Sequence, residues 1–189
     1  MSELFILVGP SGVGKTTLAT RLMLADPNIH TVPSFTTRYR REGEVDGVDY
    51  VFITGNQFDC METRGDFLAF STVYGNKYGT TKQGVYAKLH KGHDVLLVLD
   101  YKGLQDALEV FPNAVSVFIA PPSTETLEKR LKARGKDPLE TIKHRLRIAE
   151  NELRNARELD HLIVNECVDC ASEQLKHIVR ATRRECSVA

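Results

Sequence analysis

The chain has 189 residues, of which 42% are hydrophobic and 26% are charged, and these values suit one globular domain with small insertions. They exclude the disordered, collagen-like and fibrous classes. Lys plus Arg and Asp plus Glu both number 25, so the net charge is zero, and we expect neither a nucleic-acid nor a membrane partner because either usually requires a basic excess.

Apolar runs indicate strands that are buried inside a parallel sheet. In chain order, the predicted strands of this kind span residues 4–8, 94–100, 114–120 and 161–165. The predicted helices span residues 15–25, 85–90, 104–111, 124–133, 139–156 and 173–183. Strands that alternate with helices in this way predict an α/β fold, with a parallel sheet sandwiched by helices.

Between the first two of these strands, short mixed segments replace the regular alternation. The segments 32–37, 49–53 and 67–74 are β-prone, a short helix is expected at 57–64, and residues 78–81 are interpreted as a turn. The stretch 38–44 is charged and loop-like. These features predict a small mixed-β insertion within the parallel core.

The first strand leads into a glycine-rich loop. Residues 9–16, Gly-Pro-Ser-Gly-Val-Gly-Lys-Thr, match G-x-x-x-x-G-K-[ST] between a strand and a helix, which is the context that this phosphate-binding motif requires. Its glycines let backbone N–H groups turn toward a phosphate, and the helix N-terminus adds unpaired donors. Lys15 can reach β- and γ-phosphate oxygens, and the Thr16 hydroxyl can ligate Mg²⁺. A nucleoside triphosphate bound with Mg²⁺ is therefore favoured over a turn that merely caps the helix.

Three further motifs follow the loop. They are residues 34–52 (Ser-Phe-Thr-Thr-Arg-Tyr-Arg-Arg-Glu-Gly-Glu-Val-Asp-Gly-Val-Asp-Tyr-Val-Phe), residues 75–80 (Gly-Asn-Lys-Tyr-Gly-Thr) and the strand 94–100 with Gly103. These motifs resemble those of guanylate kinases and occur in that family's order and spacing. The resemblance runs from about residue 4 to 182. It implies a single domain of the P-loop NTPase type in three regions: a core (1–33, 84–122 and 141–189), an acceptor-binding insertion (34–83) and a helical lid (123–140).

The resemblance also implies a reaction. The γ-phosphoryl group of ATP would pass in line, with the help of Mg²⁺, to GMP or dGMP and give GDP or dGDP. The acceptor phosphate is itself the nucleophile, so neither a covalent intermediate nor a strong general base is expected. The expected partners are small nucleotides, and the resemblance is compatible with a monomer or a homodimer.

The implied site residues form three overlapping groups. The ATP contacts are Gly9, Pro10, Ser11, Gly12, Val13, Gly14, Lys15, Thr16, Thr17, Arg134 and Asn165. Thr16 would bind the metal, and Asn165 would contact the adenine, with a plain strand-end Asn as the alternative for Asn165. The GMP contacts are Arg38, Arg41, Tyr50 and Tyr78, which would hold the phosphate, Ser34, Thr80 and Asp100, which would face the base, and Glu44, which would line the pocket. The catalytic groups are Lys15, Arg41, Arg134 and Arg145. Guanidinium forks and phenols suit a phosphate monoester. The alternative for residues 38–41 is a solvated charged loop that has no role in binding. Arg130 and Arg147 are expected to be solvated.

Two positions depart from the family pattern. Ala69 stands where guanylate kinases carry the Glu that accepts hydrogen bonds from guanine, and an unpaired buried donor costs about 1–3 kcal/mol. Asp100, Ser71, Thr72 or water are the remaining acceptors. Val98 replaces the first Asp of an Asp-x-Asp pattern that helps to hold Mg²⁺. These changes leave two alternatives open: a kinase for another base, and a weakly active interaction module, which the intact phosphate loop disfavours.

The four cysteines are Cys60, Cys167, Cys170 and Cys186. Cys167 and Cys170 have C-x-x-C spacing, but the sequence shows neither a strand-to-helix redox context nor a second ligand pair, so ordinary reduced thiols are favoured. The first residues resemble no signal peptide, and no apolar run approaches membrane-spanning length. We therefore expect a cytoplasmic protein.

Overall fold

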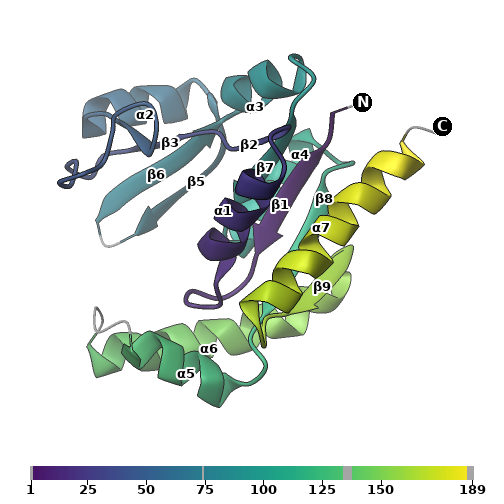
Figure 1. Cartoon of the computed structure of the whole chain (residues 1–189). Coiled ribbons are helices and arrows are strands. Elements are labelled where there is room, and N and C mark those ends of the chain that lie inside the picture. Colours follow the sequence, from purple (N-terminus) through teal and green to yellow (C-terminus); the bar gives the residue numbers. More distant parts are fainter. Residues whose placement is uncertain (1, 74, 134–137, 187–189) are drawn as a thin grey trace.

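The computed structural model of the chain describes residues 2–73, 75–133 and 138–186, and it contains two sheets with helices around them (Figure 1). The larger sheet has five parallel strands in the order β2-β7-β1-β8-β9. These strands are β1 (Leu4–Val8), β2 (Ile29–His30), β7 (Asp94–Val98), β8 (Val115–Ala120) and β9 (His161–Val164). The four predicted core strands are confirmed, and the two-residue edge strand β2 is too short to have produced a sequence signal.

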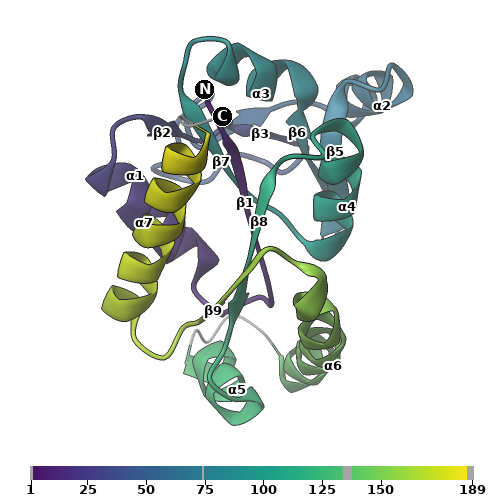
Figure 2. The same cartoon turned by 90° about the vertical axis from the view of Figure 1, so that its right-hand side faces the viewer.

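Helices cover both faces of the parallel sheet, as expected (Figure 2). One face packs against α1 (Lys15–Ala25) and α7 (Val168–Glu185), and the other against α3 (Lys82–Leu89) and α4 (Tyr101–Val110). Successive side chains of β1 alternate between the two apolar clusters, since Phe5 and Leu7 face one and Leu4, Ile6 and Val8 the other. A strand that is buried on both faces reads as a continuous apolar run, which is why its position was predictable.

The insertion forms the second sheet, in the order β4-β3-β6-β5. Its elements are β3 (Ser34–Thr36), β4 (Tyr50–Phe52), α2 (Gly55–Thr63), β5 (Phe67–Val73) and β6 (Asn76–Thr81). The interpretation of residues 78–81 as a turn is wrong, because they lie in β6 and pair with both β3 and β5. Pairing on both sides overrides the local turn tendency of Gly79, where a Cβ would lie 2.6 Å from the Phe67 ring.

The chain between β8 and β9 forms two packed helices and a short turn. These are α5 (Thr124–Ala133), α6 (Leu139–Asn155) and the 3₁₀ turn η1 (Ala156–Glu158). Buried Leu127 and Leu131 of α5 meet Ile142 and Ala149 of α6 in a small apolar cluster of their own. Figure 1 shows this helical pair and the second sheet on opposite sides of the carboxyl end of β1.

The cysteine pair lies where β9 leads into α7. Cys167 is the N-cap residue of α7, so the pair does lie in a strand-to-helix context, because the helix begins five residues earlier than predicted. Cys167 and Cys170 are exposed, and all four cysteines are free. Among the described residues, no group of three potential metal ligands occurs. That these are ordinary thiols stays a prediction.

Candidate active site

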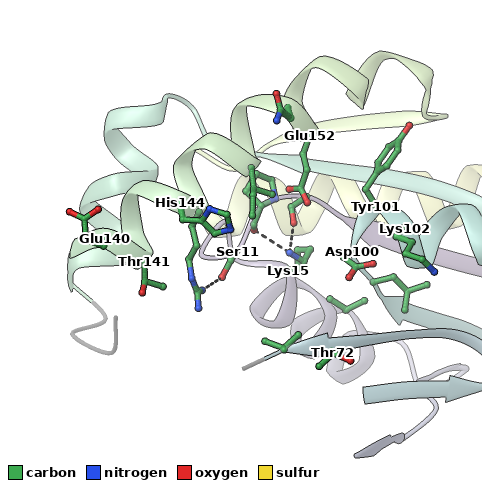
Figure 3. Close-up of a pocket in the computed structure, with 18 residues that line it drawn as sticks. Ser11, Lys15, Thr72, Asp100, Tyr101, Lys102, Glu140, Thr141, His144 and Glu152 are labelled. Carbon is green, nitrogen blue, oxygen red and sulfur yellow. Dashed lines mark hydrogen bonds between the residues drawn. The ribbon is translucent and has the colours of Figure 1, made fainter. Parts of the chain in front are cut away.

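A cleft of about 1060 Å³ opens at the carboxyl ends of β1 and β7 (Figure 3). Its walls come from the loop after β1, the residues that follow β7, the end of β5 and one face of α6. Ligands of parallel α/β sheets bind beyond the carboxyl ends of the strands, where helix N-termini also converge. The cleft is thus bounded by the core, the second sheet and the helical pair.

Backbone geometry shapes the glycine-rich loop. Gly9 and Gly14 have φ values of 134° and 104°, which side chains rarely tolerate. A Cβ on Gly9 would lie 2.3 Å from the Ile119 carbonyl oxygen, and one on Gly14 would lie 2.6 Å from the Asn165 amide nitrogen. The loop therefore packs directly against β8 and the residue after β9, which leaves no room for side chains at these two points.

Lys15 follows the loop as the first residue of α1. Its ammonium donates hydrogen bonds to the carbonyl oxygens of Gly9 and, at 3.1 Å, Pro10, so it folds over the loop that precedes it. On the other side of the loop, exposed Thr16 and Thr17 line a second cavity of about 470 Å³. The predicted triphosphate contacts, residues 9–17, thus form one loop and the first turn of α1, with a cavity on each side.

Two residues that are distant from the loop in sequence connect it to the rest of the protein by hydrogen bonds. Asn165 is 1% exposed, and its Nδ2 donates to the Val13 carbonyl oxygen at 2.7 Å. Arg130 of α5 donates to the Asn165 carbonyl oxygen at 2.9 Å and lines the cavity beside Thr16. The expectation that Arg130 is solvated is wrong, because packing of α5 against the loop brings it there. The predicted contact of Asn165 with adenine stays a prediction.

The second sheet gathers the predicted phosphate-binding side chains of the acceptor site. Arg38 donates to Glu44 at 2.7 Å, and the two side chains are only 12% and 19% exposed. The Arg38 guanidinium lies 5.4 Å from the centre of the Tyr50 ring, which lies 5.9 Å from the Tyr78 ring. Glu44 also accepts a hydrogen bond of 2.8 Å from the Arg41 backbone, while Arg41 itself is exposed. This arrangement contradicts the solvated-loop alternative for Arg38.

The charges in this cluster support one another. The hydrogen bond from Arg38 lowers the pKa of the Glu44 carboxyl, and the bond to Glu44 raises the pKa of the guanidinium. Burial raises the pKa of Tyr50, so its phenol keeps its proton. A guanidinium whose plane is fixed by a carboxylate, next to the protonated phenol of Tyr50, is suited to hold a phosphate monoester.

A smaller cavity of about 100 Å³ lies between β5, β6 and the end of β7. The hydroxyls of Ser34 and Thr80 lie 3.1 Å apart in its wall. Asp100 also lines it, and its Oδ1 accepts the Gly103 backbone N–H at 2.7 Å as the N-cap of α4. The three predicted base-facing residues therefore meet around one cavity.

The two departures from the family pattern also lie at these cavities. Ala69 is 4% exposed and forms part of the wall of the smaller cavity, where it offers no hydrogen-bond acceptor. Ser71 lines the same cavity, whereas Thr72 lines the larger cleft, so only the first of these hydroxyls can replace a missing acceptor there. Val98 is 40% exposed and lines both cavities with an apolar surface.

The helix α6 presents charged side chains to the loop from across the cleft. The predicted catalytic Arg145 donates to the Ser11 hydroxyl at 2.5 Å (Figure 3). The other predicted lid arginine, Arg134, lies outside the described residues. The sequence analysis missed Glu152, which lines the cleft two helical turns after Arg145. Its only sequence signal is that seven-residue spacing, which places both side chains on the same helix face.

Comparisons with known proteins agree with this geometry. The sequence profile of the family described as Guanylate kinase matches residues 1–182. A guanylate kinase from Chromobacterium violaceum is 43% identical over 183 residues, which are 97% of this chain and 87% of that protein. One from Hahella chejuensis is 44% identical over 186 residues, or 98% of this chain and 89% of that protein.

Solved structures give the same result. A crystal structure of guanylate kinase from Anaplasma phagocytophilum aligns with a TM-score of 0.75 and 31% identity, over 96% of this chain and 86% of that one. A shikimate kinase from Bacteroides thetaiotaomicron aligns with a TM-score of 0.50 and 15% identity, over 94% of this chain and 98% of that one, which shows a shared fold alone. In the parts of the chain that the structure describes, no helix has the length and apolar character needed to cross a membrane.

Proposed function

The chain belongs to the guanylate kinase family and is a nucleoside monophosphate kinase, and on that premise we propose that it transfers the γ-phosphoryl group of ATP to GMP or dGMP. The observation that carries the proposal is that the phosphate-loop cleft and the smaller acceptor cavity share one wall, formed by residues 98–100. A donor phosphate and an acceptor nucleotide bound in these two cavities lie on either side of the same strand end.

On the donor side, the loop amides and Lys15 hold the triphosphate. Mg²⁺ fits this site because the Thr16 hydroxyl is exposed beside the loop, and phosphate oxygens and waters complete the usual ligands of this ion. The ion, when bound, supplies charge neutralisation on the phosphates. The ammonium of Lys15, which bonds to loop carbonyls without nucleotide, is placed to exchange those bonds for β- and γ-phosphate oxygens.

On the acceptor side, Arg38, Tyr50 and Tyr78 hold the phosphate of the monophosphate, and Glu44 fixes the guanidinium plane. Arg41, which is exposed in this structure, is proposed to turn toward the phosphates once both nucleotides are bound. The acceptor phosphate is already ionised at neutral pH, so the protein's task is positioning and charge stabilisation rather than proton removal.

Residues 123–140, which include α5, act as the lid, and α6 follows it in the chain. Arg145 of α6 already bonds to the phosphate loop through Ser11, and Arg134 belongs to the lid segment. Guanidiniums delivered over the transferring group neutralise charge that spreads over its equatorial oxygens. Closure also excludes water, which otherwise competes as the acceptor.

The test is a coupled assay with ATP and Mg²⁺ across the common ribo- and deoxyribonucleoside monophosphates. We expect GMP and dGMP to be turned over fastest, with ADP formed in equal amounts. Turnover of another base with no activity on GMP would instead support the alternative that Ala69 raises. The family match over nearly the whole chain and the intact phosphate loop argue against a non-catalytic interaction module.

We also propose a cytoplasmic location and action as a monomer or homodimer on small nucleotides. The zero net charge supports the absence of a nucleic-acid partner, and the four free cysteines fit a reducing compartment. Sedimentation with and without nucleotides distinguishes the two assembly states.

A further inference from the structure

Glu152 is a carboxylate that the proposed mechanism does not use, although it lies at the centre of the cleft. It belongs to α6, and Figure 3 shows it reaching from that helix toward Lys15. Its Oε2 is buried and has no hydrogen-bond partner among the described residues. A buried acceptor without a partner is destabilising, and more so when it is charged, so such an atom calls for a donor that arrives in the working complex.

The charges around Glu152 point to the identity of that donor. Burial disfavours its ionised form and raises its pKa, Lys15 opposes this rise, and Asp100 adds to it. Two carboxylates next to a triphosphate site repel the substrate unless a cation lies between them and the phosphates. The cation that acts on Glu152 in this structure is the ammonium of Lys15, which also donates hydrogen bonds to two loop carbonyls.

We propose that Glu152 is a positioning residue that accepts a hydrogen bond from the Lys15 ammonium once ATP is bound, and thereby fixes this ammonium on the transferring phosphoryl group. The proposal rests on the proposed function of the cleft. Arg145 is bonded to Ser11, so the proposed Glu152 contact gives α6 a second contact with the phosphate loop, of opposite charge. The helix α6 then both brings a catalytic cation and orients the lysine of the loop.

The direct test is Glu152→Gln, which keeps the shape and removes the charge. We expect kcat to fall by about 10- to 100-fold, as for loss of a hydrogen bond to a charged group, while KM for GMP changes less than twofold. The matched control is Glu150→Gln, which removes the same charge from an exposed position of the same helix and should retain wild-type kcat. Equal losses in both variants, or a full kcat in Glu152→Gln, would overturn the proposal.

A double-mutant cycle with Lys15→Ala identifies the partner, with ATP affinity measured by calorimetry as a readout that needs no turnover. If Glu152 acts through Lys15, the Glu152→Gln change weakens ATP binding in the wild-type background and has no further effect in the Lys15→Ala background. If Glu152→Gln weakens ATP binding further in the Lys15→Ala background and also changes the Mg²⁺ requirement, the proposal is overturned, and the partner of Glu152 is the hydration shell of the metal. If the wild type is inactive but Glu152 and Lys15 are still coupled in their effect on ATP affinity, the proposed function is wrong and this inference stands.

A pH profile separates the positioning role from a structural one. The pKa of Glu152 is raised by burial in the nucleotide-free protein, so wild-type kcat/KM for ATP should fall on the acid side above the range of an ordinary Glu, and Glu152→Gln should lack that limb. The other titratable side chains that line the cleft are Lys15, Asp100, Tyr101, Lys102, Glu140, His144 and Arg145. Several of these groups are common to both enzymes, so the limb is assigned to Glu152 from the difference between the two profiles. An acid limb that is unchanged in the variant would contradict the role.

Discussion

The two phosphate-binding regions of the molecule are built from different parts. The donor loop consists of consecutive residues whose backbone conformation makes the site, and Gly9 and Gly14 are needed because neighbouring main chain and Asn165 leave no room for a Cβ. The acceptor site consists of long side chains from three strands and a loop, held by the bond between Arg38 and Glu44. A backbone site tolerates almost no change in its framework, whereas a side-chain site can change one residue at a time, as Ala69 in the wall of the acceptor cavity illustrates.

The largest effect is expected from Lys15→Ala, which removes the side chain that the donor loop positions over itself. We expect kcat to fall by about 100- to 1000-fold, as for other deletions of one preorganised charge-stabilising group. The fold should be retained, because the bonds from Lys15 to the Gly9 and Pro10 carbonyls are partly buried bonds within the loop, and the apolar clusters on both faces of the sheet do not include Lys15. Turnover and thermal unfolding measured on the same preparation check both parts, and the exposed Lys129→Ala is the control. A wild-type kcat in Lys15→Ala would contradict the assignment of the donor site.

On the acceptor side, Arg38→Ala should raise KM for GMP by about 10- to 100-fold, the loss of a charge-assisted pair, and leave KM for ATP nearly unchanged. The matched control is Arg40→Ala, because Arg40 is an exposed arginine on the same loop. Steady-state kinetics with each substrate varied in turn gives both constants. If KM for ATP rose as much as KM for GMP, the two regions would not be separate sites, and the comparison between them would fail.

Ala69→Glu tests whether the acceptor site can be retuned by one side chain. A carboxylate at this wall of the smaller cavity is expected to lower KM for GMP by about tenfold, since a previously unpaired buried donor gains an acceptor. Ala69→Gln, which adds a similar volume without the charge, should produce a smaller gain. An unchanged KM for GMP in Ala69→Glu would show that Ser71 or Asp100 already supplies the acceptor.

The difference between a site built from backbone and a site built from side chains also explains which parts of the structure could be predicted from the sequence. The donor loop and the strand before it are encoded within a short stretch of sequence, so motif and apolar run located both. The acceptor cluster required the family resemblance, because pairing of β3 with β6 brings Tyr78 to the Arg38 side of the sheet, and that pairing was hidden by the turn-like residues of β6. The expectation for Arg130 was wrong and Glu152 was missed, because the positions of both side chains depend on how α5 and α6 pack on the loop, which no local pattern encodes.

The smallest expected effect concerns Glu44, which shapes the acceptor site without being placed on the phosphate. Glu44→Gln keeps the length and weakens the hold on Arg38, so KM for GMP should rise by about two- to tenfold at neutral pH. The pKa of Glu44 is lowered in the folded protein, so its contribution is present above the ordinary range of a Glu and is lost as the pH falls through the lowered value. The ratio of KM for GMP in Glu44→Gln to KM for GMP in the wild type should therefore be constant from neutral to mildly acidic pH and approach one only in stronger acid. Taking this ratio cancels the titration of the GMP phosphate, which is common to both enzymes. A ratio that already declines near neutrality would mean that Glu44 is not held ionised by Arg38, and the side-chain framework of the acceptor site would then need another anchor.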